Sequence, residues 1–236
     1  MDADCVNQLK SREKELSQLF RTGQIDSFAE GSWQLVKDYP KEISGYLRLI
    51  MAITAYESRS AFPPEKSRAL AKELIASSAP KNCKDWAQGF LNRKDSSNEP
   101  LDLKFTALDG RLVDLKQMRG KVVLVVFWDT SCGACEKELP YLKAAWDKFH
   151  NRGLEIVGIS GDSDKTELEK FVQNHEIPWP QFFDGTQWIN NKFIAAFGIG
   201  GFPHMFFVNR NGLFCYDRVR ASNGQFEKII SMLLTK

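Results

Sequence analysis

Two cysteines separated by two small residues, the motif Cys-Gly-Ala-Cys at positions 132–135, are the part of the sequence best suited to chemistry. They follow a continuous β-branched and aromatic run, Lys121–Trp128, which is typical of a central strand buried on both faces. They also open a helical segment that extends to about His150. A Cys-x-x-Cys pair between a strand and a helix is typical of a redox pair. We therefore predict that these two thiols form and break a disulfide, and that Trp128 packs beneath them.

The predicted helix gives the two cysteines different roles. Unpaired backbone N–H groups and the dipole at a helix N-terminus stabilise negative charge, so we expect the pKa of the Cys132 thiol to lie below the ~8.5 of free cysteine. Asp129, just upstream, would act in the opposite direction. Cys132 is the predicted nucleophile, and Cys135, almost one turn further into the helix, is the predicted resolving thiol. Gly133 and Ala134 are too small to shield Cys132 from a protein substrate.

Three other interpretations of the pair compete with this one. A zinc site needs about four ligands, but there is no second cysteine pair, and His150, His175 and His204 are scattered. Two structural thiols are the second interpretation, for which this location is a poor one. A peroxidase of the peroxiredoxin type is the third, but Val125 and Asp129 replace the proline and threonine of its P-x-x-x-T-x-x-C signature. We expect no metal and no organic cofactor.

The elements around the pair alternate between strand and helix. Asp109-Gly110 and Asn211-Gly212 are turn signals that predict two hairpins. The predicted strands are 105–107, 112–114, 121–128, 154–160, 205–208 and 214–217, and the predicted helices are 133–150, 165–174, 190–197 and 222–234. This order predicts the α/β class, with a mixed sheet.

The N-terminal part has a different pattern, in which apolar residues recur at helical spacing. It predicts an all-α region of five helices, at about 4–21, 26–38, 42–57, 64–78 and 82–93. Aligning Pro40 with Pro80 places Tyr46 on Trp86, an offset of forty residues. This indicates repeated helical hairpins that weakly resemble tetratricopeptide arrays, although the repeat is too long and only two copies are visible. An ordinary small helical bundle is the alternative.

A short polar segment ending in proline, DSSNEP at 95–100, is the predicted linker. We therefore predict a helical domain at residues 1–95 and a redox domain at residues 96–236. The 236 residues carry 32 Lys+Arg and 30 Asp+Glu, a net charge of +2 with no basic run, which argues against nucleic acid as a partner.

No stretch of the sequence approaches the ~20 consecutive apolar residues that span a membrane. The opening MDADCVNQLK also lacks the basic and apolar regions of a signal peptide. Two expectations follow, which the sequence does not separate: a cytosolic protein, or one whose targeting segment was removed.

Two longer motifs, FWDTSCGACEKELP and GFPHMFFVNRNG, carry a family resemblance. They resemble the thioredoxin-fold thiol-disulfide oxidoreductases of the TlpA and ResA-like branch of the redoxin (AhpC/TSA-related) group, over about residues 100–236. The resemblance implies a thioredoxin-like fold and a dithiol reductase that works outside the cytoplasmic membrane. It also implies that Cys132 and Cys135 match the redox pair. Pro203 matches the cis-proline that faces the pair, with an ordinary trans turn proline as the alternative, and Glu138 matches an acidic residue that follows the second cysteine.

Glu138 also has support from helical spacing. It lies three residues after Cys135, on the same face of the helix, whereas Glu136 points about 100° away. Thioredoxin has a buried acid on the preceding strand, and Val126 stands at that position here. Glu138 is therefore the candidate proton acceptor for Cys135, with a solvated surface carboxylate as the alternative. His204 follows the proline, where it either lies close to the cysteine pair or is a surface residue without a role.

The predicted function is thiol-disulfide exchange with protein substrates, most simply as a reductase supplied by an upstream electron donor protein. A disulfide oxidase or isomerase is an alternative, and so is an interaction adaptor in which the helical domain binds a protein partner. The expected location is periplasmic or at the outer face of the cytoplasmic membrane, with the cytoplasm as the alternative. In an oxidising compartment, Cys5 and Cys83 are candidates for a structural bridge.

Overall fold

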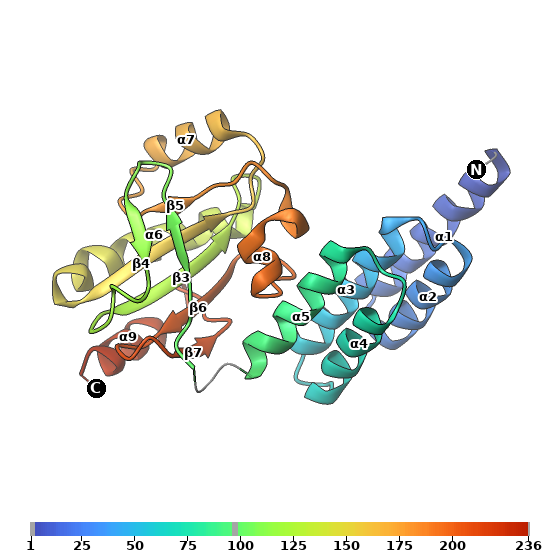
Figure 1. Cartoon of the computed structure of the whole chain (residues 1–236), viewed down its shortest axis with the longest axis horizontal. Helices are drawn as coiled ribbons and strands as arrows, with labels where there is room; N and C mark the ends of the chain where they lie inside the picture. The colour runs from blue at the N-terminus through green and yellow to red at the C-terminus, as the bar shows by residue number, and fades with distance from the viewer. Residues whose placement is uncertain (1–2, 96–98, 236) are drawn as a thin grey trace. The chain divides into compact units, whose positions relative to one another are not determined.

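The structure is a computed structural model that describes residues 3–95 and 99–235 (Figure 1). The chain divides into two compact units, Met1–Leu91 and Asn92–Lys236. Of the predicted linker at 95–100, residues 96–98 lie outside the described part. Asp95 ends a helix, and Pro100 forms a β-bridge with Leu213.

The N-terminal part consists of five helices in the described residues, as its apolar spacing predicts. They are α1 (Ala3–Arg21), α2 (Ile25–Asp38), α3 (Ile43–Ser58), α4 (Pro64–Ala76) and α5 (Lys81–Asp95). Pro64 occupies the first turn of α4, where a missing N–H costs no intrahelical hydrogen bond. Tyr46 in α3 and Trp86 in α5, the residues paired by the forty-residue offset, are both fully buried. Close packing of α2 and α3 depends on Gly45, because a Cβ there would lie 2.9 Å from a Val36 methyl.

The suggested bridge between Cys5 and Cys83 is not present. Cys83 lies in the core of the helical part, with no exposed surface, and is not disulfide-bonded. Burial raises the pKa of the Cys83 thiol to about 11. Cys83 therefore packs as a small apolar side chain, which the spacing of cysteines in the sequence does not reveal.

The second unit contains a five-stranded sheet in the order β5-β4-β3-β6-β7 (Figure 1). Its strands are β3 (Val122–Trp128), β4 (Leu154–Ser160), β5 (Gln181–Phe182), β6 (His204–Val208) and β7 (Phe214–Asp217), and a separate hairpin is formed by β1 (Lys104–Thr106) and β2 (Leu112–Asp114). β3 pairs with β4 in parallel and with β6 antiparallel. The sheet is thus mixed, as expected for the α/β class.

Helices cover both faces of this sheet. They are α6 (Gly133–Phe149), α7 (Lys165–Asn174), α8 (Lys192–Ala196) and α9 (Phe226–Thr235), with short 3-10 turns at His150–Arg152 and Trp188–Asn190. All seven residues of β3 are buried. Its side chains alternate in direction, so that Leu124 and Val126 pack in the core beneath α6 and α9, whereas Val125 and Phe127 pack in the core beneath α8 and the hairpin. Both cores need apolar residues, which explains why β3 is apolar throughout.

The expected elements agree with the structure to within two residues except for the last helix, and one strand of the structure, β5, has no expected counterpart. β5 was not predicted, because two residues are too short to show a period. The expected helix at 190–197 is confirmed as α8, which begins two residues later and ends one residue earlier, after a 3-10 turn. The last helix begins at Phe226 rather than at about Ser222, and Ser222 lies in the preceding segment, where it makes tertiary hydrogen bonds described below.

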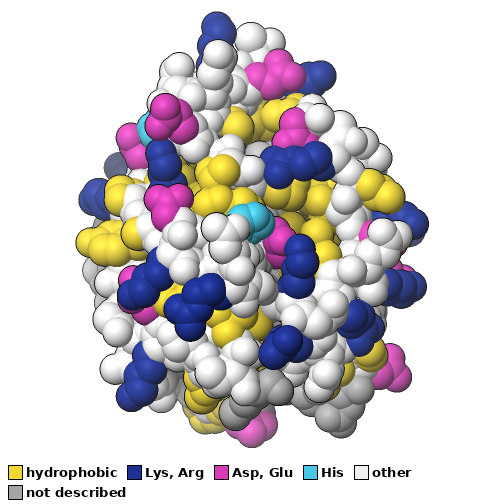
Figure 2. Space-filling view, turned by 90° about the vertical axis from the view of Figure 1, so that its left-hand side faces the viewer, with side chains coloured by type: hydrophobic (Ala, Val, Ile, Leu, Met, Phe, Trp, Pro, Cys, Tyr) yellow, Lys and Arg dark blue, Asp and Glu magenta, His cyan; other side chains and the backbone are white. Residues whose placement is uncertain are grey.

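Figure 2 shows one face of the molecule, on which basic and acidic side chains are interspersed with hydrophobic ones. This mixture fits the net charge of +2. Within residues 3–95 and 99–235, no helix combines the length and the apolar character needed to cross a membrane.

Candidate active site

The two cysteines of the motif are joined by a disulfide at the start of α6. Their Cα atoms are 5.2 Å apart, within the usual range for a disulfide. Cys132 is the N-cap of α6, and its sulfur accepts a hydrogen bond from the backbone N–H of Cys135 at 3.1 Å. The helix N-terminus therefore directs a donor at the Cys132 sulfur, which is the local geometry that stabilises a thiolate.

The two cysteines differ in exposure in the direction that the sequence predicts. Cys132 is half-buried, whereas Cys135 is 5% exposed and belongs to the core beneath α6. Gly133 and Ala134 between them are exposed. Of the two sulfur-bearing residues, Cys132 is thus the more accessible from solvent.

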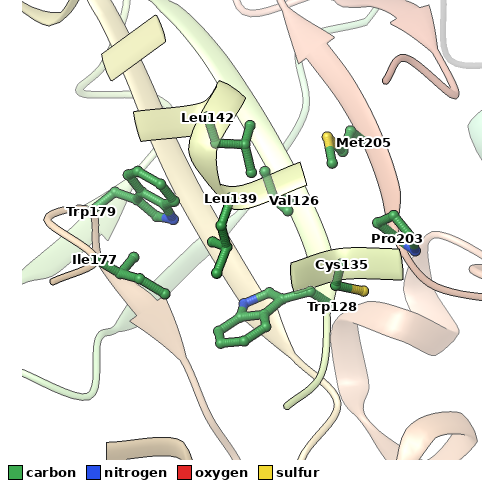
Figure 3. Close-up of a pocket in the computed structure, with 9 residues that line it drawn as sticks. All are labelled: Val126, Trp128, Cys135, Leu139, Leu142, Ile177, Trp179, Pro203 and Met205. Atoms are coloured by element: carbon green, nitrogen blue, oxygen red, sulfur yellow. The ribbon is translucent and has the colours of Figure 1, made fainter. Parts of the chain in front are cut away.

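A small apolar cavity lies beneath Cys135 (Figure 3). It is lined by Val126, Trp128, Cys135, Leu139, Leu142, Ile177, Trp179, Pro203 and Met205. The labelled side chains come from β3, α6, β6 and the segments before β5 and β6, so the cavity is closed by residues far apart in the sequence. None of these side chains is a carboxylate, and Val126 occupies the position at which thioredoxin has a buried acid.

Pro203 lines the same cavity as Cys135, and the peptide bond between Phe202 and Pro203 is cis. Pro203 lies directly before β6, which pairs with β3. Because β3 leads to Cys132 and the antiparallel β6 begins after Pro203, the sheet brings the proline and the cysteine pair to the same end of these two strands.

Glu138 is not a solvated surface residue. It is 6% exposed, and its carboxylate accepts hydrogen bonds from the backbone N–H of Ser222 at 2.9 Å and from the Ser222 hydroxyl at 2.7 Å. Arg220 adds a positive charge that interacts with Glu138. The side chain is thus held on the α6 face that carries Cys135, although it does not line the cavity.

His204 occupies neither of the two places expected for it. It is buried, at 5% exposed, so it is not a surface residue. Its ring lies edge-on to Phe127, which packs in the core on the sheet face opposite to α6, whereas Cys132 packs against the core beneath α6. Nε2 of His204 lies 2.8 Å from Oδ1 of Asp217, and burial lowers the pKa of His204 below its usual value.

Trp128 closes one side of the cavity beneath Cys135, in agreement with its predicted place under the pair. Its indole N–H donates to Oε1 of Gln181 at 2.9 Å. Sequence reasoning missed Ile177 and Trp179 as part of the site, because their link to Cys135 is a contact between distant segments. Among the described residues, no group of three or more His, Cys, Asp or Glu side chains is arranged to hold a metal ion.

Comparison with known proteins relates this site to characterised families. A model of the AhpC/TSA family matches residues 98–216. The chain is 31% identical over 128 residues to the thiol-disulfide oxidoreductase ResA of Bacillus thuringiensis, a match that covers 53% of this chain and 72% of the relative. It is 32% identical over 111 residues to ResA of Geobacillus thermodenitrificans, covering 47% of this chain and 62% of that protein.

Solved structures give the same result for the fold. The thioredoxin domain of a thiol-disulfide oxidoreductase from Bacteroides vulgatus is 27% identical, with a TM-score of 0.51, and the match covers 58% of this chain and 97% of that one. A thiol:disulfide interchange protein of the thioredoxin family from Chlorobium tepidum is 22% identical, with a TM-score of 0.50, covering 58% and 97%. The second of these is similar in fold alone.

Proposed function

The chain belongs to the AhpC/TSA family and is a thiol-disulfide oxidoreductase, and we propose that it reduces disulfides in partner proteins through Cys132 and Cys135. The observation that carries the proposal is the disulfide at the N-terminus of α6, with the first cysteine more exposed than the second. The pair itself supplies the two electrons that the reaction needs, so the exchange requires no organic cofactor or metal.

The proposed reaction has two steps. The Cys132 thiolate attacks one sulfur of the partner disulfide, which forms a mixed disulfide and expels the other partner sulfur as a thiolate. Cys135 then loses its proton and attacks the Cys132 sulfur. The Cys132–Cys135 disulfide forms, and the second partner sulfur leaves as a thiolate that takes up a proton. Two electrons have passed to the partner, and an upstream electron donor protein with a dithiol must return the pair to its reduced form.

We assign Glu138 to the second step, as the group that accepts the Cys135 proton. Two features support this role. Glu138 lies about one turn after Cys135 on the same helix face, and its carboxylate is held by Ser222 rather than free to turn into solvent. None of the side chains that line the cavity beneath Cys135 is acidic, so the cavity lining itself offers no carboxylate to accept this proton.

We assign Pro203 to recognition. It lines the same cavity as Cys135, and it lacks an N–H group, so it cannot donate to the reacting sulfurs. A partner chain that approaches Cys132 would lie beside the backbone before Pro203. Pro203→Ala is expected to weaken capture of the partner more than it changes the reactivity of Cys132 towards small thiol reagents.

The direction of the reaction depends on the stability of the Cys132 thiolate. Asp129, just before the motif, opposes the stabilising effect of the helix N-terminus, which favours a reductant over a strong oxidant. Reduction of insulin by the prereduced protein, compared with oxidative refolding of a reduced substrate by the oxidised protein, tests the direction. Efficient oxidation with negligible reduction would identify the alternative, a disulfide oxidase or isomerase.

We propose that the two predicted domains have separate roles. Residues 96–236 carry the redox chemistry, and residues 1–95 bind a protein partner. An adaptor whose function resides in the helical part alone is the competing proposal. Titration of thiols with and without reductant separates the two. Two additional, reversibly oxidised thiols are expected after reduction, whereas an adaptor has no need of them.

We also propose a location outside the cytoplasm, in the periplasm or at the outer face of the cytoplasmic membrane. A reductase of protein disulfides finds its substrates where disulfides persist, which is in oxidising compartments. Fractionation of cells that express the native gene, followed by immunodetection, tests this. Recovery with cytoplasmic markers alone would rule out the proposed location.

A further inference from the structure

The loop that carries Cys132 is anchored by an acidic residue that follows another strand. Asp162 lies just after the end of β4, and its Oδ1 accepts hydrogen bonds from the backbone N–H of Thr130 at 3.1 Å and from the Thr130 hydroxyl at 2.6 Å. Thr130 lies two residues before Cys132, in the segment between β3 and α6. Asp162 therefore holds the segment before Cys132 through two hydrogen bonds, both from Thr130.

The Asp162 carboxylate is itself fixed by the sheet. Its Oδ2 accepts from the Ser160 hydroxyl at 2.7 Å, and its backbone N–H donates to the same hydroxyl oxygen at 3.0 Å. Ser160 has no exposed surface, and its carbonyl accepts from the Asn191 side chain at 3.0 Å. The Asp162 carboxylate is thus held in place by the buried end of β4 rather than by a surface loop.

Gly161, between Ser160 and Asp162, lies against both the strand that leads to the cysteines and the residue before Pro203. Its backbone N–H donates to the carbonyl of Trp128 at 2.8 Å. A Cβ at Gly161 would lie 2.7 Å from the ring of Phe202, which precedes Pro203, so a side chain there would displace this ring. Residues 160–162 therefore touch both the cysteine loop and the proline loop.

We propose that Asp162 is a positioning residue that sets the stability of the Cys132–Cys135 disulfide. The inference rests on the proposed function and assigns a new residue to it. A disulfide is stabilised by the effective concentration of one thiol beside the other, which falls when the segment carrying one of them becomes mobile. With Thr130 held by Asp162, Cys132 stays beside Cys135. The reduced pair is therefore a stronger reductant than it would be if the segment carrying Cys132 were mobile.

The test is the equilibrium of the full chain with reduced and oxidised glutathione, for the wild type and Asp162→Ala. The variant disulfide is expected to be about tenfold easier to reduce, which corresponds to about 30 mV. Asp162→Asn keeps an oxygen acceptor for Thr130 and should stay within about threefold of the wild type. If Asp162 served only to stabilise the fold, the two variants would not differ in their glutathione equilibrium.

The matched control is Asp164→Ala, which removes a carboxylate two residues further along. Asp164 caps α7 through the N–H groups of Thr166 and Glu167, at 2.8 and 3.0 Å. Its loss should leave the glutathione equilibrium unchanged. Equal equilibria for the wild type and both alanine variants would overturn the proposal.

If Asp162→Ala does not fold, Thr130→Val provides the same test, since it removes only the hydroxyl. A shift of about threefold in the same direction is expected from the loss of one of the two hydrogen bonds, and no shift overturns the proposal. Because glutathione is the probe, the result does not depend on a protein substrate. Failure of the wild type to reduce insulin, with the expected shifts in the variants, would reject the proposed function and leave the positioning role standing.

Discussion

Ser222 binds the carboxylate of Glu138 with both its backbone N–H and its hydroxyl, at 2.9 and 2.7 Å, although 84 residues separate the two in the chain. This contact joins the segment before α9 to α6, at a buried carboxylate about one turn after Cys135. A change at either residue should therefore alter both exchange and stability.

Glu138→Gln is expected to slow release of the mixed disulfide at least tenfold, while the first attack by Cys132 changes little, because only the Cys135 proton depends on the carboxylate. Stopped-flow measurement of both steps checks this. The variant should also lose about 1–3 kcal/mol of stability, since a buried charge-assisted hydrogen bond is replaced. Ser222→Ala, which keeps the N–H donor, should have a smaller effect on both. Unaltered rates for both steps in Glu138→Gln would show that the carboxylate has no role in exchange.

In the reduced protein at neutral pH, Cys132 is expected to be the thiol that iodoacetamide modifies first. It is more exposed than Cys135, and its sulfur receives the N–H group at the start of α6. Peptide mapping after brief labelling measures this. Cys83 is the internal control, because burial raises its pKa to about 11 and it should react only after unfolding. Faster labelling of Cys135 than of Cys132 would reverse the assigned roles.

Cys135→Ser should trap a partner protein covalently on Cys132. The attacking thiolate forms the mixed disulfide, and no second thiol remains in place to resolve it. Non-reducing electrophoresis, with and without added reductant, detects the complex. Cys132→Ser is the control and should capture nothing. Capture by neither variant from extracts of the native organism would contradict the two-step reaction.

Lowering the pH from 7 to 5 is expected to destabilise the protein in part through His204. Burial holds the pKa of His204 below its ordinary value in the folded state, while Asp217 acts in the opposite direction and the nearby Arg93 and Arg218 lower the pKa further. The unfolded chain therefore takes up the proton first as the pH falls through about 6.5, and the free energy of unfolding decreases.

Denaturant unfolding at several pH values measures this effect. His204→Gln should show a smaller loss of stability between pH 7 and 5 than the wild type. The matched control is His175→Gln, at a half-buried position just after α7. An identical pH dependence for His204→Gln and the wild type would refute the prediction.

Local patterns along the chain were enough to predict the α/β class, the helical N-terminal part and the two cysteines. These patterns are the period of apolar residues, the proline and glycine stops, and the Cys-x-x-Cys spacing after a buried strand. The order of strands and helices around the motif followed in the same way, since hairpin turns and helix caps depend on residues close together in the chain.

The distant residues that complete the site could be identified only from how the elements pack. Ser222 binds Glu138, Asp162 holds Thr130, and the cavity beneath Cys135 is closed by segments from across the sheet. His204 could be placed only once β6 was paired with β3, because the register of a strand selects the face to which each side chain points. Such contacts join residues that are far apart in the chain, and no spacing along the sequence records them.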